Sequence, residues 1–167
     1  EAFGAFEEAD AAFGTESRLS GRVFPRPGWN PEQKEAQERE LRSTDIAQPA
    51  LGAAALAAWR VLQGFGVEGA AFAGHSYGEL VALHAAGRFD ADQLHRLSAV
   101  RGKAMKGDGS DRGSMLAVQA SFAQLEKALA EEKLKLVIAN RNAPEQNVLS
   151  GATAEIERAE KAFAARS

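Results

Sequence analysis

The chain has 167 residues, of which 45% are hydrophobic and 26% charged, a balance typical of a folded protein of one domain or of one domain and part of another. The formal net charge of -3 and the absence of a basic stripe with interleaved aromatic residues argue against nucleic acid as a partner. There is no cysteine, which excludes a disulfide framework and a thiol nucleophile and is compatible with the cytoplasmic location that we expect.

The N-terminal part of the chain is predicted to be helical. Residues 1–13 indicate an amphipathic helix anchored by Phe3, Phe6 and Phe13, and their acidic character is not typical of a signal peptide. Residues 22–31 contain proline and glycine and are predicted to be a surface connection without regular helix. The charged run over residues 31–42 indicates a solvated helix face.

A second long helix is predicted from Pro49 to about Gln63, with the proline in its first turn and two glycines after its end. Its apolar stretch is too short to span a bilayer, so we expect no membrane association. The side chains expected to face inward are Leu51, Leu56, Val61 and Leu62.

The motif that carries chemistry is Gly74-His75-Ser76-Tyr77-Gly78. Residues 67–73 are predicted to form a short buried strand, and an apolar helix follows the motif as far as Gly87. A sharp strand-to-helix turn can lift a serine hydroxyl clear of its neighbours if the flanking residues lack side chains, which Gly74 and Gly78 do. We therefore predict that Ser76 is a nucleophile on such an elbow.

The order of the predicted elements changes after residue 106, where strands begin to alternate with helices. Asp90 and Gln93 indicate a capping box for a helix running to about Lys106, and residues 107–113 are a linker by composition. The later elements predicted are a strand at 114–120, a helix from the Ser121–Gln124 cap to 131, strands at 134–140 and 147–150, and a helix from 153.

This order predicts an α/β fold in two domains. Residues 1–113 would be part of an α/β-hydrolase-like subdomain that carries the elbow. Residues 114–167 follow the order β–α–β–β–α, which is an incomplete ferredoxin-like unit that lacks its last strand. The chain is therefore expected to end within this small subdomain.

A serine nucleophile needs a base, and the only histidines are His75, His84 and His95. The side chain of His75 diverges from that of its neighbour, His84 lies eight residues along the helix, where it is expected to pack, and His95 is predicted to project into solvent. Because the histidine of hydrolase-like folds follows the serine in the chain, we expect the base to lie beyond Ser167.

Arg101 is predicted to sit within an apolar arc of its helix, where its guanidinium needs a partner. One such partner would be the carboxylate of an acidic substrate, which the planar fork matches with two hydrogen bonds. A structural ion pair with a local Asp or Glu is the alternative that composition alone favours. The arc consists of Leu94, Leu97, Val100, Ala104 and Met105.

The start of the elbow helix predicts an oxyanion site, because the backbone N–H groups there point over the serine. The N–H of Tyr77 is the expected first donor. A second donor is not identified in this chain.

Four segments together resemble the malonyl-CoA:acyl carrier protein acyltransferase domain of fatty acid and polyketide synthases. They are AQPALGAAALAAWRVL at 47–62, GHSYGEL at 74–80, RGKAM at 101–105 and NRNAPEQNVLSG at 140–151. The tyrosine after the serine, RVFPRPGW and AQPALGA are most similar to iterative synthases of the enediyne and polyunsaturated fatty acid type.

The resemblance implies that Ser76 takes malonyl from coenzyme A and passes it to the phosphopantetheine thiol of an acyl carrier protein. Arg101 matches the arginine that holds the malonyl carboxylate, Gln48 matches a glutamine near the active site, and His75 belongs to the motif and shapes the pocket. No metal and no bound cofactor are implied, and the partners would be the carrier protein and other synthase domains such as a ketosynthase.

Two parts of the family pattern are absent from this sequence. A Gly-Gln-Gly loop that supplies the second oxyanion donor is expected before Glu1, and the catalytic histidine after Ser167. The resemblance thus implies a fragment of the domain that does not turn over alone.

Two other functions remain open at this point. One is a serine esterase or thioesterase on the same elbow, which would need no carboxylate anchor at Arg101. The other is a non-catalytic scaffold or carrier-docking module that keeps the elbow without its chemistry.

Overall fold

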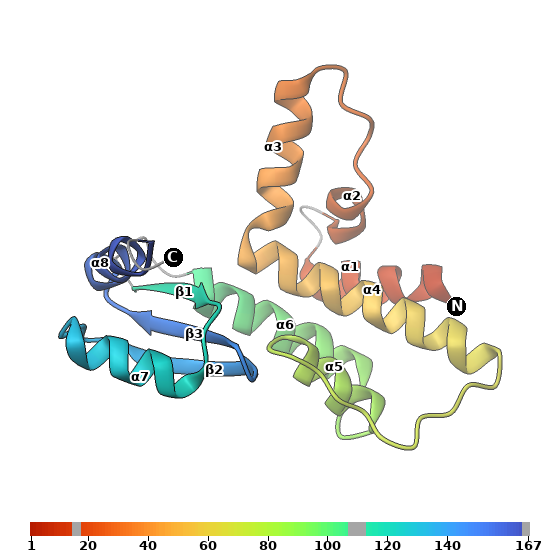
Figure 1. Ribbon diagram of the computed structural model, residues 1–167. Helices are drawn as coiled ribbons and strands as arrows, with labels where there is room; N and C mark the ends of the chain where they lie inside the picture. The colour runs from red at the N-terminus through yellow and green to blue at the C-terminus, as the bar shows by residue number, and fades with distance from the viewer. Residues whose placement is uncertain (15–17, 107–112, 165–167) are drawn as a thin grey trace. The chain divides into compact units, whose positions relative to one another are not determined.

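The computed structural model describes residues 1–14, 18–106 and 113–164 and divides into two compact units, Glu1–Gly107 and Asp108–Ser167. We call these the N-terminal and C-terminal units and describe each by itself (Figure 1). The fold is mixed α/β, as predicted. Of the linker predicted at 107–113, residues 107–112 lie outside the described residues.

The N-terminal unit is helical throughout its regular elements. Its longest helix, α4, packs along α6, and α1 lies against both (Figure 1). The helices within the described residues are α1 (Ala2–Phe13), α2 (Leu19–Val23), α3 (Pro31–Arg42), α4 (Thr44–Gly64), α5 (Gly78–Ala85) and α6 (Ala91–Lys106).

Small side chains let these helices approach closely. A Cβ on Gly102 of α6 would lie 2.6 Å from the carbonyl oxygen of Thr44, so only glycine fits where the two helices meet. The Thr44 hydroxyl donates to the Gly102 carbonyl oxygen at 3.1 Å across the same contact. The buried core that α1 and α2 share with α4 is mostly alanine: Ala5, Ala9, Leu19, Ile46, Ala50, Ala53, Leu56 and Ala57.

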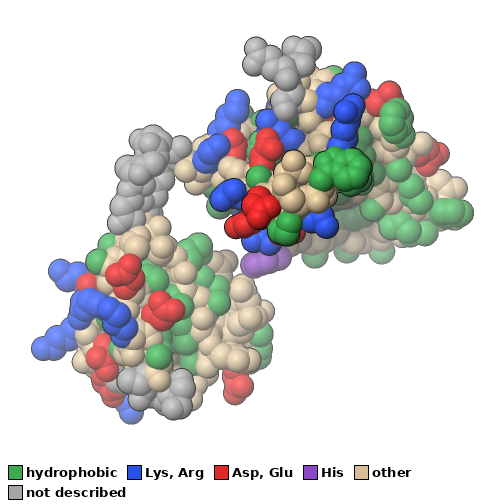
Figure 2. All heavy atoms as spheres, turned by 90° about the horizontal axis from the view of Figure 1, so that it is seen from above, with side chains coloured by type: hydrophobic (Ala, Val, Ile, Leu, Met, Phe, Trp, Pro, Cys, Tyr) green, Lys and Arg blue, Asp and Glu red, His purple; other side chains and the backbone are tan. Residues whose placement is uncertain are grey.

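The first three helices can be compared with the sequence predictions. Phe3 is 75% exposed and does not anchor α1, whereas Phe6 and Phe13 pack on the core. Residues 22 and 23 belong to the short helix α2, while 24–30 are non-helical as predicted. The solvated helix over 31–42 is confirmed, because α3 buries none of its residues. Figure 2 shows Lys and Arg side chains interspersed with Asp and Glu on the visible face of the molecule.

The long helix α4 begins earlier than predicted. It starts at Thr44, so Pro49 is a buried residue inside the helix and not in its first turn. The tertiary contacts of the helix outweigh the hydrogen bond that a proline removes. Of the side chains predicted to face inward only Leu56 is buried. Leu51, Val61 and Leu62 are 56%, 38% and 46% exposed.

The predicted strand at 67–73 is not a strand. These residues have no regular secondary structure, and Val67 is 44% exposed. A strand is defined by backbone hydrogen bonds to a neighbouring strand, and the described part of the N-terminal unit contains none. The segment still leads directly into the elbow.

The C-terminal unit has the predicted β–α–β–β–α order, with β3 paired antiparallel to both β1 and β2. The capping box at Ser121 and Gln124 is confirmed. Leu125, Leu149 and Ile156 form its buried core. The elements are β1 (Ser114–Val118), α7 (Phe122–Glu131), β2 (Val137–Ala143), β3 (Gln146–Gly151) and α8 (Thr153–Ala164).

Candidate active site

Ser76 occupies a strained turn. Its φ is 54°, in the left-handed region that side chains other than glycine rarely adopt, and its side chain is exposed. Backbone hydrogen bonds from Gly78 N–H to the His75 carbonyl oxygen (2.9 Å) and from Glu79 N–H to the Ser76 carbonyl oxygen (3.2 Å) close the turn. This is the geometry that a nucleophile elbow requires.

The two glycines of the motif differ in what they do. A Cβ on Gly74 would lie 2.0 Å from the carbonyl oxygen of Gly78, so the tight turn excludes any side chain there. A Cβ on Gly78 would meet nothing within 4 Å. The prediction that both glycines are sterically required is therefore right for Gly74 and wrong for Gly78, which simply begins α5.

Arg101 connects the elbow to two helices. One of its terminal nitrogens donates to the Ser76 hydroxyl oxygen at 3.3 Å, and the other donates to the Gln48 side-chain oxygen at 2.8 Å. The Gln48 amide nitrogen in turn lies 3.0 Å from the sulfur of Met105. Gln48 is only 5% exposed, so the guanidinium is fixed on one side by a buried amide and faces the nucleophile on the other.

The structural ion pair considered for Arg101 is not present, since Arg101 forms no salt bridge with any Asp or Glu of the described ranges. The predicted apolar arc is also wrong in detail. Leu97, Val100 and Met105 are 42%, 66% and 54% exposed. The buried face of α6 is instead made of residues at i, i+1, i+4 and i+8, two of them small enough to pack against another helix: Leu94, His95, Ser98 and Gly102.

None of the three histidines is hydrogen-bonded to Ser76 in the part of the chain that the structure describes. His75 is exposed, and Nδ1 of His84 lies 3.0 Å from the Phe89 carbonyl oxygen, which agrees with the packing role predicted for it. Because a carbonyl only accepts, that Nδ1 carries the proton. These three side chains thus supply no base within reach of Ser76.

His95 is buried and not solvated as predicted. It is 3% exposed, and both ring nitrogens lack a hydrogen-bond partner. Burial lowers the pKa of the imidazole because it disfavours the charged form. Glu8 and Asp92 oppose this shift, whereas Arg60 and His84 add to it. A helical wheel based on hydrophobicity alone misses this burial, because it gives no weight to Ser98 and Gly102, whose small size marks the packed face.

Tyr77 and Gly52 make a contact that sequence reasoning missed. The Tyr77 side chain is 7% exposed, and its hydroxyl lies 2.6 Å from the Ser98 hydroxyl. Gly52 sits inside α4, where glycine costs about 1 kcal/mol relative to alanine. A glycine at such a cost inside a helix indicates that another group packs closely against the helix there, although the sequence does not show that this group is Tyr77.

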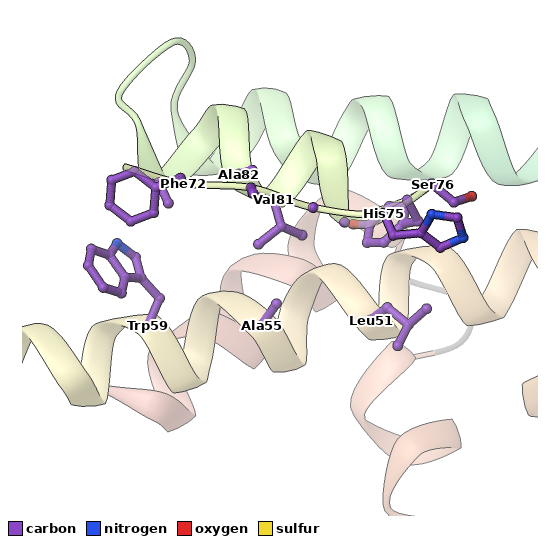
Figure 3. Close-up of a pocket in the computed structure, with 13 residues that line it drawn as sticks. Leu51, Ala55, Trp59, Phe72, His75, Ser76, Val81 and Ala82 are labelled. Carbon is purple, nitrogen blue, oxygen red and sulfur yellow. The ribbon is translucent and has the colours of Figure 1, made fainter. Parts of the chain in front are cut away.

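An apolar pocket of about 630 Å³ lies between α4 and α5 beside the elbow. Figure 3 shows Trp59 and Phe72 facing each other at one end, with His75 and Ser76 at the other. The two aromatic rings meet edge to face, with centroids 5.2 Å apart. Arg101 is not among the residues that line this pocket.

In the described ranges, no group of three or more His, Cys, Asp or Glu side chains is placed to hold a metal ion. The same residues include no helix with both the length and the apolar character needed to cross a membrane.

The elbow, the strained serine and the guanidinium beside it define a serine-dependent acyl-transferring or acyl-hydrolysing protein of the α/β class. Residues 18–167 match the family described as "Acyl transferase domain", and the chain belongs to that family. This identification agrees with the resemblance found in the sequence.

A relative and a solved structure of this family are each similar over nearly the whole chain. Polyketide synthase GfsA of Streptomyces halstedii is 36% identical over 168 residues, which cover 98% of this chain and 2% of that protein. The acyltransferase domain from the second module of the salinomycin polyketide synthase is 34% identical, with a TM-score of 0.79 over 99% of this chain and 36% of that one.

A malonyl-transacylase of a type II polyketide synthase, solved in complex with its acyl carrier protein, is 33% identical. Its TM-score is 0.81, over 99% of this chain and 52% of that chain. The chain therefore spans about half the length of that transacylase and a small part of the polyketide synthase that it matches.

Proposed function

We propose that this chain is the part of a malonyl acyltransferase domain that carries the nucleophile and the carboxylate anchor. The observation that carries the proposal is the guanidinium of Arg101, 3.3 Å from the Ser76 hydroxyl oxygen. A fixed cation beside a nucleophile suits an acyl donor with a thioester at one end and a free carboxylate at the other.

The proposed reaction has two half-steps, acylation of Ser76 and transfer of the acyl group from it. The Ser76 oxygen attacks the thioester carbonyl of malonyl-CoA while a base takes the hydroxyl proton; the tetrahedral intermediate then expels the coenzyme A thiolate, which takes up a proton. In the second half-step the base takes the proton of the phosphopantetheine thiol as its sulfur attacks the malonyl-serine ester. The serine oxygen then leaves and takes the proton from the base, which gives the malonyl thioester of the carrier protein and the free Ser76 hydroxyl.

Each site residue has a proposed role in this cycle. The Tyr77 backbone N–H at the start of α5 would donate to the oxyanion, while Gln48 would hold Arg101 in position. His75 is exposed beside the nucleophile and would shape the entrance to the pocket. Because His84 is bonded elsewhere and His95 is buried, we propose that the base is a histidine supplied from outside these 167 residues.

The partner that we propose is an acyl carrier protein, since the similar malonyl-transacylase was solved with one. Polyketide synthase GfsA and a polyunsaturated fatty acid synthase of a Thraustochytrium species are similar in sequence, the latter 32% identical over 143 residues. We therefore propose further synthase domains, a ketosynthase among them, in the whole protein. The finer prediction of an enediyne or polyunsaturated fatty acid type stays a proposal.

We also propose the architecture of the two units. The N-terminal unit would be part of a hydrolase-like α/β subdomain that carries the elbow. The C-terminal unit would be an incomplete ferredoxin-like subdomain, because its sheet order β1-β3-β2 is the one that the split βαβ motif gives before its last strand is added.

The two alternatives from the sequence are not favoured. Family membership and the similar solved transacylases give no support to an esterase or to a scaffold that has lost its chemistry. Hydrolysis of the malonyl-serine faster than its transfer to a carrier thiol would nevertheless restore the hydrolase alternative.

The decisive experiment is the intact mass of the full-length protein after brief incubation with malonyl-CoA and, separately, with acetyl-CoA. A malonyl-sized adduct that is absent from the Ser76→Ala variant is the expected result. An adduct that persists in that variant would refute Ser76 as the nucleophile, and no adduct with either donor would refute the proposed function.

A further inference from the structure

The side chain of Tyr77, immediately after the nucleophile, joins the elbow to α6. Its hydroxyl lies 2.6 Å from the Ser98 hydroxyl, and the Ser98 hydroxyl donates to the Leu94 carbonyl oxygen at 2.6 Å. Since serine has one hydroxyl proton and uses it for Leu94, the phenol must be the donor to Ser98. The tyrosine is thus bound in a fixed direction.

The neighbouring helix α4 is shaped to accept this phenol. A Cβ on Gly52 would lie 2.2 Å from the Tyr77 hydroxyl oxygen and 3.3 Å from the Ser98 hydroxyl oxygen. Any side chain at Gly52 would therefore displace the ring. A buried hydroxyl held by a hydrogen bond with no spare room around it rigidifies the groups that it connects.

The phenol contact lies one helical turn from the carboxylate anchor. Ser98 precedes Arg101 by three residues on α6, and Gly52 follows Gln48 by four residues on α4, so each pair shares one face of its helix. The same two helices therefore hold Tyr77 through Gly52 and Ser98, and Arg101 through Gln48. Displacing the ring would move Ser76 relative to the guanidinium.

Burial raises the pKa of Tyr77, a shift that its hydrogen bond with Ser98 and the charge of Arg101 partly oppose. The phenol therefore keeps its proton at neutral pH and remains a donor. Its bond to Ser98 is maintained under the conditions in which a thioester donor is used.

We propose that the Tyr77 phenol is a positioning group that sets the separation between Ser76 and Arg101. It thereby sets the preference for acyl donors with a terminal carboxylate over donors without one. This inference rests on the proposed function and deepens it. Acetyl transfer needs only the serine and the oxyanion donors, whereas malonyl transfer also needs the guanidinium at a fixed distance, so misplacement should penalise malonyl alone.

The test is Tyr77→Phe in the full-length protein, with initial rates of Ser76 acylation measured by quenched intact mass for malonyl-CoA and acetyl-CoA. We expect the ratio of the malonyl rate to the acetyl rate to fall about tenfold. Ser98→Ala, which removes the acceptor, should give the same change in the ratio of the two rates. The double variant should lower the ratio of the two rates no further than either single variant does, because both substitutions remove the same hydrogen bond.

Ser121→Ala is the matched control, since it weakens the cap of α7 in the C-terminal unit and leaves Tyr77, Ser98 and Arg101 unchanged in the sequence. It should lower thermal stability and leave the ratio of malonyl to acetyl rates as in the wild type. Equal losses for both donors in Tyr77→Phe would overturn the inference, and so would an unchanged ratio of the two rates in both Tyr77→Phe and Ser98→Ala. In either case a malonyl adduct on the wild-type protein would still uphold the proposed function. A wild type without a malonyl adduct would overturn both.

Discussion

A terminal nitrogen of Arg101 lies 3.3 Å from the Ser76 hydroxyl oxygen, although the two residues are 25 positions apart in the chain. The other terminal nitrogen is bound to the buried amide of Gln48 at 2.8 Å. The guanidinium is thus oriented before any substrate arrives, so a bound carboxylate would not have to order it.

Replacing Arg101 by alanine should slow malonyl loading of Ser76 by about ten- to a hundredfold, the equivalent of a charge-assisted hydrogen bond of about 1.5–3 kcal/mol. Acetyl loading should be unchanged or faster. Initial acylation rates with the two donors measure the effect. Arg101→Lys should recover part of the malonyl rate, because the charge remains while the planar fork is lost. Equal losses for both donors would instead point to a purely structural role.

Replacing Ser76 should separate chemistry from backbone strain. Both Ser76→Ala and Ser76→Gly should abolish acylation, which intact mass measures directly. Because φ at this position is 54°, the glycine variant should be about 1 kcal/mol more stable than the alanine variant. Denaturant unfolding of the two variants checks this difference. A glycine variant less stable than the alanine one would argue against strain at the elbow.

The two motif glycines form a matched pair. Gly74→Ala should disrupt the turn and abolish acylation, because its Cβ would lie 2.0 Å from a backbone oxygen. Gly78→Ala has free space at the start of α5 and should be tolerated, with a gain of up to about 1 kcal/mol in the free energy of unfolding. Circular dichroism, thermal melts and acylation rates compare the two. Similar damage from both substitutions would contradict the geometry described for the elbow.

The buried His95 should make the protein less stable in mild acid. Its folded-state pKa is below the ordinary value of 6.5, so the unfolded chain binds a proton first as the pH falls. The free energy of unfolding should therefore be highest above about pH 6.5 and decline toward the folded-state pKa. Denaturant titrations from about pH 7.5 down to about pH 5, read with a probe in the N-terminal unit, measure the slope.

Two substitutions separate the causes of this effect. His95→Leu should flatten the decline and raise stability by about 1–3 kcal/mol, because two unpartnered buried nitrogens are removed. His95→Gln should flatten the decline without that gain, since polar atoms stay buried. An unaltered pH slope in both variants would show that another group causes the acid sensitivity.

The sequence by itself determined the features that depend on near neighbours. The turn at Ser76, the capping boxes at Asp90 and Ser121, and the β–α–β–β–α order follow from local backbone preferences and short-range hydrogen bonds. Family membership also follows from motifs of a few residues each.

Only the tertiary structure decided which faces are buried and which distant side chains meet. Residues 67–73 are apolar enough for a strand, yet a strand needs a partner that the described residues of their unit do not contain. His95 is buried because Ser98 and Gly102 let another helix come close, and Gln48 reaches Arg101 because α4 packs along α6. Such contacts depend on shape and distance between elements, which a periodic pattern along one element does not contain.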